Sequence, residues 1–198
     1  MAFLNTFCNA SPPAGSPLQV LAAEAATCVA CGLAGTRTQV VFGRGNPAAD
    51  LVVVGEAPGG EEDRRGEPFV GPAGKLLDLL LLSVGFPRGS AYICNVLKCR
   101  PPNNRDPLPD EVAQCATWLH RQLEAIRPKV LLAVGKFAGQ MLSGSEASIS
   151  KLRGVVHTYR DIPVVATYHP AYLLRTPSAT RGTWQDLQLM RSILDERD

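Results

Sequence analysis

Four short apolar runs, each rich in β-branched residues, constrain the fold of this 198-residue chain more than any other feature. They are residues 51–55 (LVVVG), 91–97 (AYICNVL), 130–135 (VLLAVG) and 163–169 (PVVATYH). Runs that are apolar on both faces are typical of buried parallel strands. Helical patterns alternate with them, at residues 73–84, 110–126, 136–143 and 183–194. The alternation predicts an α/β fold, with a parallel sheet covered by helices on both faces.

One domain is expected from the length and from a mean hydropathy of +0.02, because 198 residues can bury a sizeable core. Residues 1–17 are small, polar and proline-rich, and we predict a flexible leader there, followed by a single domain over 18–198. The Ala- and Leu-rich segment 18–27 predicts a first helix. At the start of the helix predicted over 110–126, Asp110 is the expected N-cap.

The charge balance limits the kinds of partner. Twenty basic and 18 acidic residues give a net charge of +2, which excludes a histone-like or strongly polybasic binder. A nucleic acid would therefore have to meet a local basic patch. No apolar run approaches the roughly 18 residues of a membrane-spanning helix. A secretory signal begins with basic residues, and the first 36 residues hold no Lys or Arg. We expect a cytoplasmic protein with no membrane contact.

The cysteines indicate a metal centre. In a reducing compartment disulfides are a poor explanation for six cysteines, whereas metal or cluster ligation is a good one. The candidate ligands are Cys28, Cys31, Cys99 and Cys115. Four thiolates suit either zinc or an iron–sulfur cluster. The alternative is that they are ordinary buried cysteines. Cys8, in the leader, and Cys94, inside a strand, are left over, and we expect Cys94 to pack in the core.

Unusual residues follow three of the predicted strands. The loop GEAPGG, with Glu56, follows the first run, Asn95 lies near the end of the second, and His169 closes the fourth. In open α/β sheets ligands bind beyond the carboxyl ends of the strands, so these residues should converge on one edge. The Gly-rich loop matches neither GxxxxGK[ST] nor GxGxxG, which argues against the usual nucleotide sites.

Three of the candidate side chains have competing interpretations. Asn95 is an amide inside an apolar strand; it is either tied to backbone or reserved for a ligand with adjacent donor and acceptor, such as a pyrimidine edge. Phe69, in the stiff segment PFVGP, either packs beneath its loop or offers a stacking surface for a planar ring. A lone histidine at a strand end, such as His169, is more often structural.

The residues after His169 suggest contact with a duplex. They include Leu173, Leu174 and Arg175. Exposed leucines would suit insertion in place of a displaced base, with the arginine meeting phosphate, although both leucines could instead pack inward. Arg175 would share a basic phosphate-binding rim with Lys98, Arg100 and Arg105.

Together GEAPG, PFVG, NVLKCRPPNNR and HPAYLLR, with the four cysteines in order, resemble the iron–sulfur-containing family 4 uracil-DNA glycosylases of bacteria and archaea. The resemblance runs from about Thr27 to the C-terminus. It implies a three-layer α/β/α sandwich around a four-stranded parallel sheet. It also implies a structural 4Fe–4S cluster, whose ligands would be Cys28, Cys31, Cys99 and Cys115.

The resemblance also implies the roles of the site residues. Phe69 would stack on a flipped-out uracil, and Asn95 would pair with its O4 and N3 edge. Glu56, Ala57 and Pro58 would line the uracil site and place the attacking water. His169 would hydrogen-bond to uracil O2, which makes it, with Glu56, a catalytic residue.

The expected activity is that of a monofunctional glycosylase, acting as a monomer on uracil in single- or double-stranded DNA and leaving an abasic site. Apart from Lys98 in NVLKCRPPNNR, no lysine lies in the motifs at the sheet edge, which argues against a Schiff base and strand cleavage. One alternative is a non-catalytic DNA- or polymerase-associated binding module, against which the presence of Glu56, Phe69, Asn95 and His169 counts. Another is a zinc-stabilised domain that binds a different heterocycle.

Overall fold

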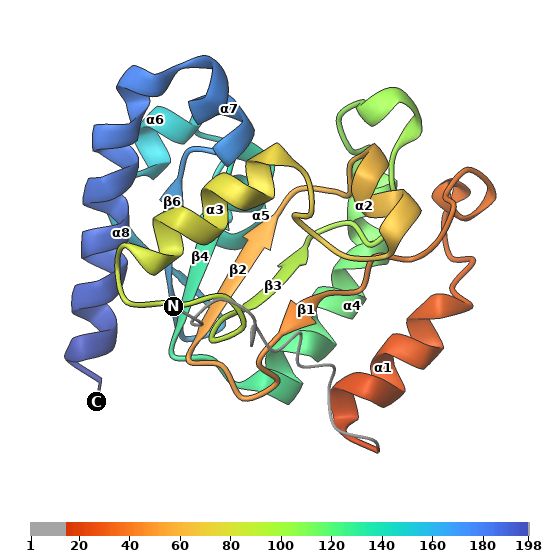
Figure 1. The fold of residues 1–198 in the computed structure, drawn as a ribbon. Helices are drawn as coiled ribbons and strands as arrows, with labels where there is room; N and C mark the ends of the chain where they lie inside the picture. Colours follow the sequence, from red (N-terminus) through yellow and green to blue (C-terminus); the bar gives the residue numbers. More distant parts are fainter. Residues whose placement is uncertain (1–14, 198) are drawn as a thin grey trace, which may run out of the picture.

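A computed structural model describes residues 15–197, which form one six-stranded sheet between two layers of helices (Figure 1). The strand order is β1-β3-β2-β4-β6-β5. Its four central strands are parallel, as predicted: β3 (Tyr92–Asn95), β2 (Leu51–Gly55), β4 (Val130–Val134) and β6 (Ile162–Thr167). The predicted α/β/α architecture is confirmed.

Two short antiparallel edge strands were not predicted, so the four-stranded sheet becomes six-stranded. They are β1 (Arg44–Gly45), which pairs with β3, and β5 (Val156–Tyr159), which pairs with β6. β1 is too short to leave a pattern in the sequence, and β5 is half exposed and polar. The β5–β6 turn uses Arg160 and Asp161, both with positive φ (48° and 67°), where the glycine or asparagine typical of such turns is missing.

The predicted helices are all present, with small shifts at their ends. They are α1 (Pro17–Ala26), α3 (Pro72–Leu82), α4 (Pro109–Ile126), α5 (Lys136–Ser143) and α8 (Thr180–Asp195). Shorter elements, which lack enough residues to show a helical period, were missed: α2 (Gly60–Arg65), α6 (Ile149–Leu152), α7 (Pro170–Arg175), and the 3₁₀ turns η1 (Gly32–Gly35), η2 (Pro102–Asn104) and η3 (Pro177–Ala179). No helix within residues 15–197 is long and apolar enough to cross a bilayer.

Two helix starts differ from the prediction. Asp110 is not the N-cap of α4: the cap is Leu108, whose N–H donates to Oε2 of Glu111 at 2.9 Å. At α1, Ser16 is the N-cap and its hydroxyl accepts from the Gln19 N–H, so the last residues assigned to the leader belong to the helix start. The rest of the leader, with Cys8, lies outside the described residues.

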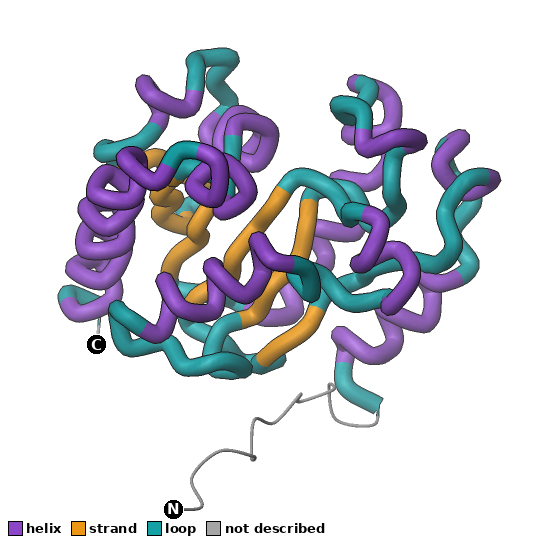
Figure 2. The backbone as a smooth tube through the Cα atoms, turned by 45° about the horizontal axis from the view of Figure 1, so that its top comes forward, coloured by secondary structure: helices purple, strands orange, loops and turns teal. Residues whose placement is uncertain are grey.

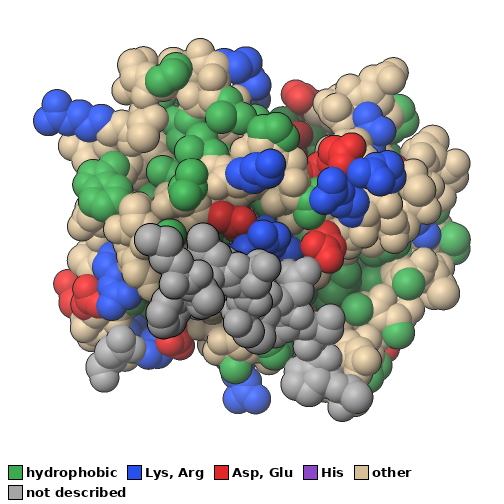
Figure 3. All heavy atoms as spheres, in the orientation of Figure 1, with side chains coloured by type: hydrophobic (Ala, Val, Ile, Leu, Met, Phe, Trp, Pro, Cys, Tyr) green, Lys and Arg blue, Asp and Glu red, His purple; other side chains and the backbone are tan. Residues whose placement is uncertain are grey.

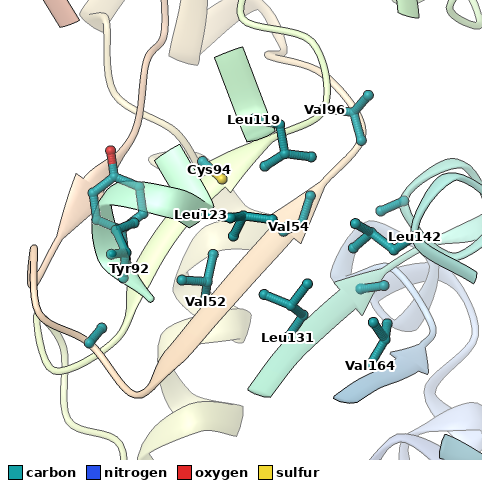
Figure 4. Close-up of a cluster of buried hydrophobic side chains, with 14 of the residues drawn as sticks. Val52, Val54, Tyr92, Cys94, Val96, Leu119, Leu123, Leu131, Leu142 and Val164 are labelled. Carbon is teal, nitrogen blue, oxygen red and sulfur yellow. The ribbon is translucent and has the colours of Figure 1, made fainter. Parts of the chain in front are cut away.

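Alternate residues along the central strands enter two separate cores. Val52, Val54, Leu131 and Val164 pack against α1, α4 and α5, and Figure 4 shows this cluster around Leu119 and Leu123 of α4. Their neighbours, among them Val53 and Leu132, pack on the opposite face against α3 and α8. A strand with apolar residues on both faces must be covered twice, which explains the three layers visible in Figure 2.

Truncating the core should destabilise the fold strongly. Leu131 is fully buried at the centre of the sheet, so we expect Leu131→Ala to lower the free energy of unfolding by about 2–5 kcal/mol. Leu79, which is 64% exposed on α3, is the matched control, and Leu79→Ala should change stability by less than about 0.5 kcal/mol. Urea unfolding followed by circular dichroism measures both, and equal losses would contradict the assigned core.

Candidate active site

The turns after β2, β3 and β6 bring the predicted site residues to one edge of the sheet. Gly55, the last residue of β2, is opposite Asn95, the last residue of β3, in the parallel register. A Cβ at Gly55 would lie 2.7 Å from Cζ of Phe69 and would also collide with Oδ1 of Asn95. Glycine is therefore required here, because the ring and the amide both close over this backbone position.

Asn95 has an amide that the protein itself does not use. The residue is 2% exposed, yet within residues 15–197 its side chain forms no hydrogen bond. Its surroundings are fixed: the Val96 N–H donates to Gly55 O and the Leu97 N–H to Glu56 O, both at 2.9 Å. Of the two interpretations of this residue, the one with a donor and acceptor held for a ligand fits the structure.

Phe69 is held in a strained loop conformation. Its φ of 54° lies in the left-handed region, which is unfavourable for an aromatic residue and which neighbouring groups must enforce. Glu62 Oε1 accepts from the amides of residues 70 and 71, at 3.1 and 3.3 Å. From the other side Nε of Arg44 donates to Pro68 O at 3.0 Å. These three hydrogen bonds brace the backbone of the loop on both sides of Phe69, whose side chain is buried at 7% exposure.

His169 is the N-cap of α7, and its own cap bond fixes its protonation. Nδ1 accepts from the Ala171 N–H at 3.1 Å, so the proton of the neutral ring lies on Nε2. Burial, and next the charge of Arg175, lower the pKa of His169 to about 4. The ring lies 5.7 Å from that of Phe69 and packs beside Gly135, which has a positive φ of 99°. His169 is thus a neutral hydrogen-bond donor.

Glu56 is half-buried directly after β2 and is followed by half-buried Ala57 and buried Pro58. Burial, and next the charge of Asp106, raise the pKa of Glu56 to about 7, while Lys136 opposes the shift. Neither Asp106 nor Lys136 was identified from the sequence. Lys136 follows the carboxyl end of β4. Glu56 was selected because it follows the carboxyl end of a strand, and the same criterion would have selected Lys136. A lysine does lie at this sheet edge, which corrects the expectation from the motifs.

The predicted DNA-contacting residues differ in their exposure to solvent. Leu173 is 2% exposed and packs inside, whereas Leu174 is 51% exposed and Arg175 is exposed beside it. The predicted basic rim loses Lys98, which is 1% exposed. Arg105 forms an ion pair with Glu111, at 2.6 Å. The face drawn in Figure 3 carries Lys and Arg side chains among Asp and Glu side chains, without one continuous basic surface.

The four candidate cysteines line one cavity between η1, the segment after β3, and α4. Cys99 and Cys115 are buried, while Cys28 and Cys31 are half-buried. Nη1 of Arg37 donates to Sγ of Cys99 at 3.5 Å, and the Lys98 N–H donates to Sγ of Cys115 at 3.2 Å. The fifth described cysteine, Cys94, is fully buried in the core, as predicted.

The donor set of this cavity fits a zinc or iron–sulfur centre. Across residues 15–197 no three His, Cys, Asp or Glu side chains are close enough to form a metal site as they stand. Even so, all the His, Cys, Asp and Glu residues that line the cavity are cysteines, and such soft thiolate ligands select zinc or iron–sulfur centres. Burial raises the pKa of Cys115 to about 11, so the thiolate form needs a cation beside it.

Comparison with known proteins gives one consistent family. The sequence profile of the Uracil DNA glycosylase superfamily matches residues 42–188. A type-4 uracil-DNA glycosylase of Archaeoglobus fulgidus is 49% identical over 162 residues, covering 78% of this chain and 81% of that protein. A type-4 enzyme of Thermotoga maritima is 43% identical over 181 residues, covering 89% and 94%. A DNA polymerase of Bacillus phage SP01 is 29% identical over 154 residues, which are 77% of this chain and 17% of the polymerase.

His169 should stay neutral across the physiological range. Its pKa is lowered from 6.5 to about 4, so its contribution to stability is complete above pH 6.5 and is lost as the pH falls towards 4. We expect the ¹⁵N NMR spectrum to show the Nε2–H tautomer at pH 7 and a titration midpoint near 4. His169→Gln assigns the signal. A midpoint near 6.5 would contradict the burial and the cap bond described above.

Proposed function

We propose that this chain, which belongs to the uracil DNA glycosylase superfamily and is a uracil-DNA glycosylase, removes its base with Glu56, Asn95 and His169. It is a hydrolase acting on the N-glycosyl bond, and its product is an abasic site for base excision repair. Uracil is buried in the duplex, so the nucleotide must be flipped out before these side chains reach it. Residues 16–197, from the N-cap of α1 onward, form the single catalytic domain.

The unused amide of Asn95 is the observation that carries this assignment. An amide pairs with the O4 acceptor and the N3–H donor of uracil, whereas cytosine presents the opposite pattern. Phe69, across Gly55 from the amide, stacks on the flipped base. Ala57 and Pro58, in the turn after β2, line the same site. Selection thus depends on a rigid amide beside a rigid ring.

His169 stabilises the leaving group. When the bond between C1′ and N1 breaks, its electron pair moves onto the uracil ring and its carbonyl oxygens, and the sugar becomes oxocarbenium-like. The Nε2–H of neutral His169 donates to O2, where the negative charge develops. A buried imidazolium is not required, in keeping with the lowered pKa.

Glu56 holds the attacking water. Its raised pKa makes it a stronger base than an ordinary carboxylate. The water oxygen adds to C1′, its proton passes to Glu56, and the uracil anion later takes a proton from solvent. Lys136, near Glu56, influences the carboxylate by its charge and forms no bond to the sugar.

The DNA contacts come from the end of α7. Leu174 fills the position of the flipped nucleotide and Arg175 meets phosphate, because both are exposed on the helix that His169 caps, whereas Leu173 anchors the segment. The substrate is uracil in single- or double-stranded DNA. One chain supplies every residue of the site, which suits a monomer. A cytoplasmic location suits the free thiols of the described cysteines.

Cys28, Cys31, Cys99 and Cys115 hold a 4Fe–4S cluster. Through these four residues a bound cluster would cross-link the segment after α1, the segment after β3 and α4, and would supply no redox step to the reaction. The N–H groups of Arg37 and Lys98 stabilise the ligating sulfurs.

The glycosylase assay tests the residue assignments. On a labelled oligonucleotide with one uracil, we expect cleavage only after alkali, and none where cytosine replaces the uracil. Asn95→Ala and His169→Ala should each lower kcat/KM about 10²–10³-fold, since each removes a hydrogen bond to the reacting base. Ser145→Ala, at a half-buried position of another loop, is the control.

Other outcomes of this assay have definite meanings. Wild-type activity in both variants would overturn the residue assignments and leave the glycosylase reaction itself established. No cleavage by the iron-loaded wild type would favour the non-catalytic binding module. Scission without alkali that disappears in Lys136→Met would mean that this lysine forms a Schiff base.

The pH dependence of the reaction should report Glu56. If its carboxylate holds the water, single-turnover rates rise between about pH 6 and 8 with a midpoint near the raised pKa of about 7. Glu56→Gln should remove this rise and lower the rate about 10²-fold. Glu61→Gln, at an exposed position of α2, is the control, and an unchanged profile in Glu56→Gln would exclude the side chain from the reaction.

Iron analysis tests the cluster. The purified protein should be brown, absorb near 400 nm and hold about four iron atoms, as one cubane requires. Cys115→Ser should lose the absorbance, whereas Cys94→Ser, in the core, should keep it. A colourless wild-type protein with one zinc would contradict the cluster.

A further inference from the structure

Lys98 is a buried cation with no part in the proposed reaction or in DNA binding. It is 1% exposed and is one of the largest fully buried side chains. An ammonium group inside a protein is costly unless opposite charge and hydrogen bonds compensate it. Because Lys98 is buried, its ammonium cannot reach a DNA phosphate, and a role in the phosphate-binding rim does not explain why a lysine occupies this position.

One end of Lys98 fixes the residue that reads the base. Its Nζ donates to the backbone carbonyl of Asn95 at 2.6 Å. The same turn is held by the Val96 N–H on Gly55 O and the Leu97 N–H on Glu56 O. Lys98 therefore closes the turn on which the free amide of Asn95 stands.

The other end of Lys98 lies in the cysteine cavity. The residue lines that cavity, and its backbone N–H donates to Sγ of Cys115 at 3.2 Å. Its ammonium lies 6.0 Å from the ring centre of Phe42, a further weak stabilisation. No carboxylate of the described residues 15–197 forms an ion pair with Lys98. The acceptors of its N–H groups are the Asn95 carbonyl and Sγ of Cys115.

We propose that Lys98 is a positioning residue that links the cysteine site to Asn95. Its ammonium offsets the negative charge of the ligated thiolates and, at the same time, clamps the Asn95 carbonyl beneath the uracil site. The inference rests on the proposed function, and it gives the cluster a definite part in base recognition without any redox step.

The test separates uracil binding from DNA binding. Lys98→Met keeps the apolar stem and removes the charge. We expect inhibition by free uracil to weaken about tenfold or more, and iron release to an anaerobic chelator to accelerate by a similar factor. Affinity for uracil-free DNA, and its salt dependence, should stay unchanged because Lys98 does not reach the surface. Circular dichroism verifies the fold.

Two further variants make the outcome decisive. Lys151→Met removes an exposed lysine of α6 and should change none of these quantities. Lys98→Arg keeps the positive charge, and iron should leave this variant within about twofold of the wild-type rate. This measurement still tests the proposal if the Met variant does not fold.

A folded Lys98→Met protein with wild-type uracil inhibition and iron release would overturn the proposal. So would a Lys98→Arg protein that loses iron as fast as the Met variant. If the wild type does not cleave uracil, the proposed function fails separately, while the comparison of iron release still tests the link to the cysteine site.

Discussion

The parallel register of β2 and β3 is the constraint on which the site depends. It sets Gly55 opposite Asn95, and the missing side chain at Gly55 leaves room for the Asn95 amide and the Phe69 ring. Parallel strands also send all their carboxyl ends to one edge, so β6 delivers His169 to the same place. The register persists because every central strand is buried on both faces by α1, α4 and α5 on one side and α3 and α8 on the other.

Burial at this edge acts on two ionisable groups with opposite results. It lowers the pKa of His169 to about 4 and raises that of Glu56 to about 7, because a poorly solvated environment disfavours both imidazolium and carboxylate. The two groups are thereby prepared for different tasks: a neutral donor for a developing anion, and a base that titrates near neutral pH. The cap bond from the Ala171 N–H completes the arrangement, since it decides which ring nitrogen can donate.

The cysteine cavity lies where the sheet offers least support. Residues 27–40 and the segment between β3 and α4 consist largely of loops and 3₁₀ turns, and Figure 1 shows them beside one another next to the sheet. Cross-linking such segments through one cluster would restrain them far more than their few hydrogen bonds do. Lys98 lies between this region and Asn95 and, on our proposal, carries that restraint to the uracil site.

The sequence by itself determined the central strands, the main helices, the cysteine set and the three turns that carry Glu56, Asn95 and His169, because periodicity and strand-end position are local properties. Tertiary structure decided the rest. The edge strand β1 exists only because β3 is there to pair with it. That Leu173 is buried and Leu174 exposed, that Lys98 is interior, and that Lys136 approaches Glu56 depend on elements distant in the chain. Burial is set by what packs against a residue, and the residue's own neighbours in sequence do not record it.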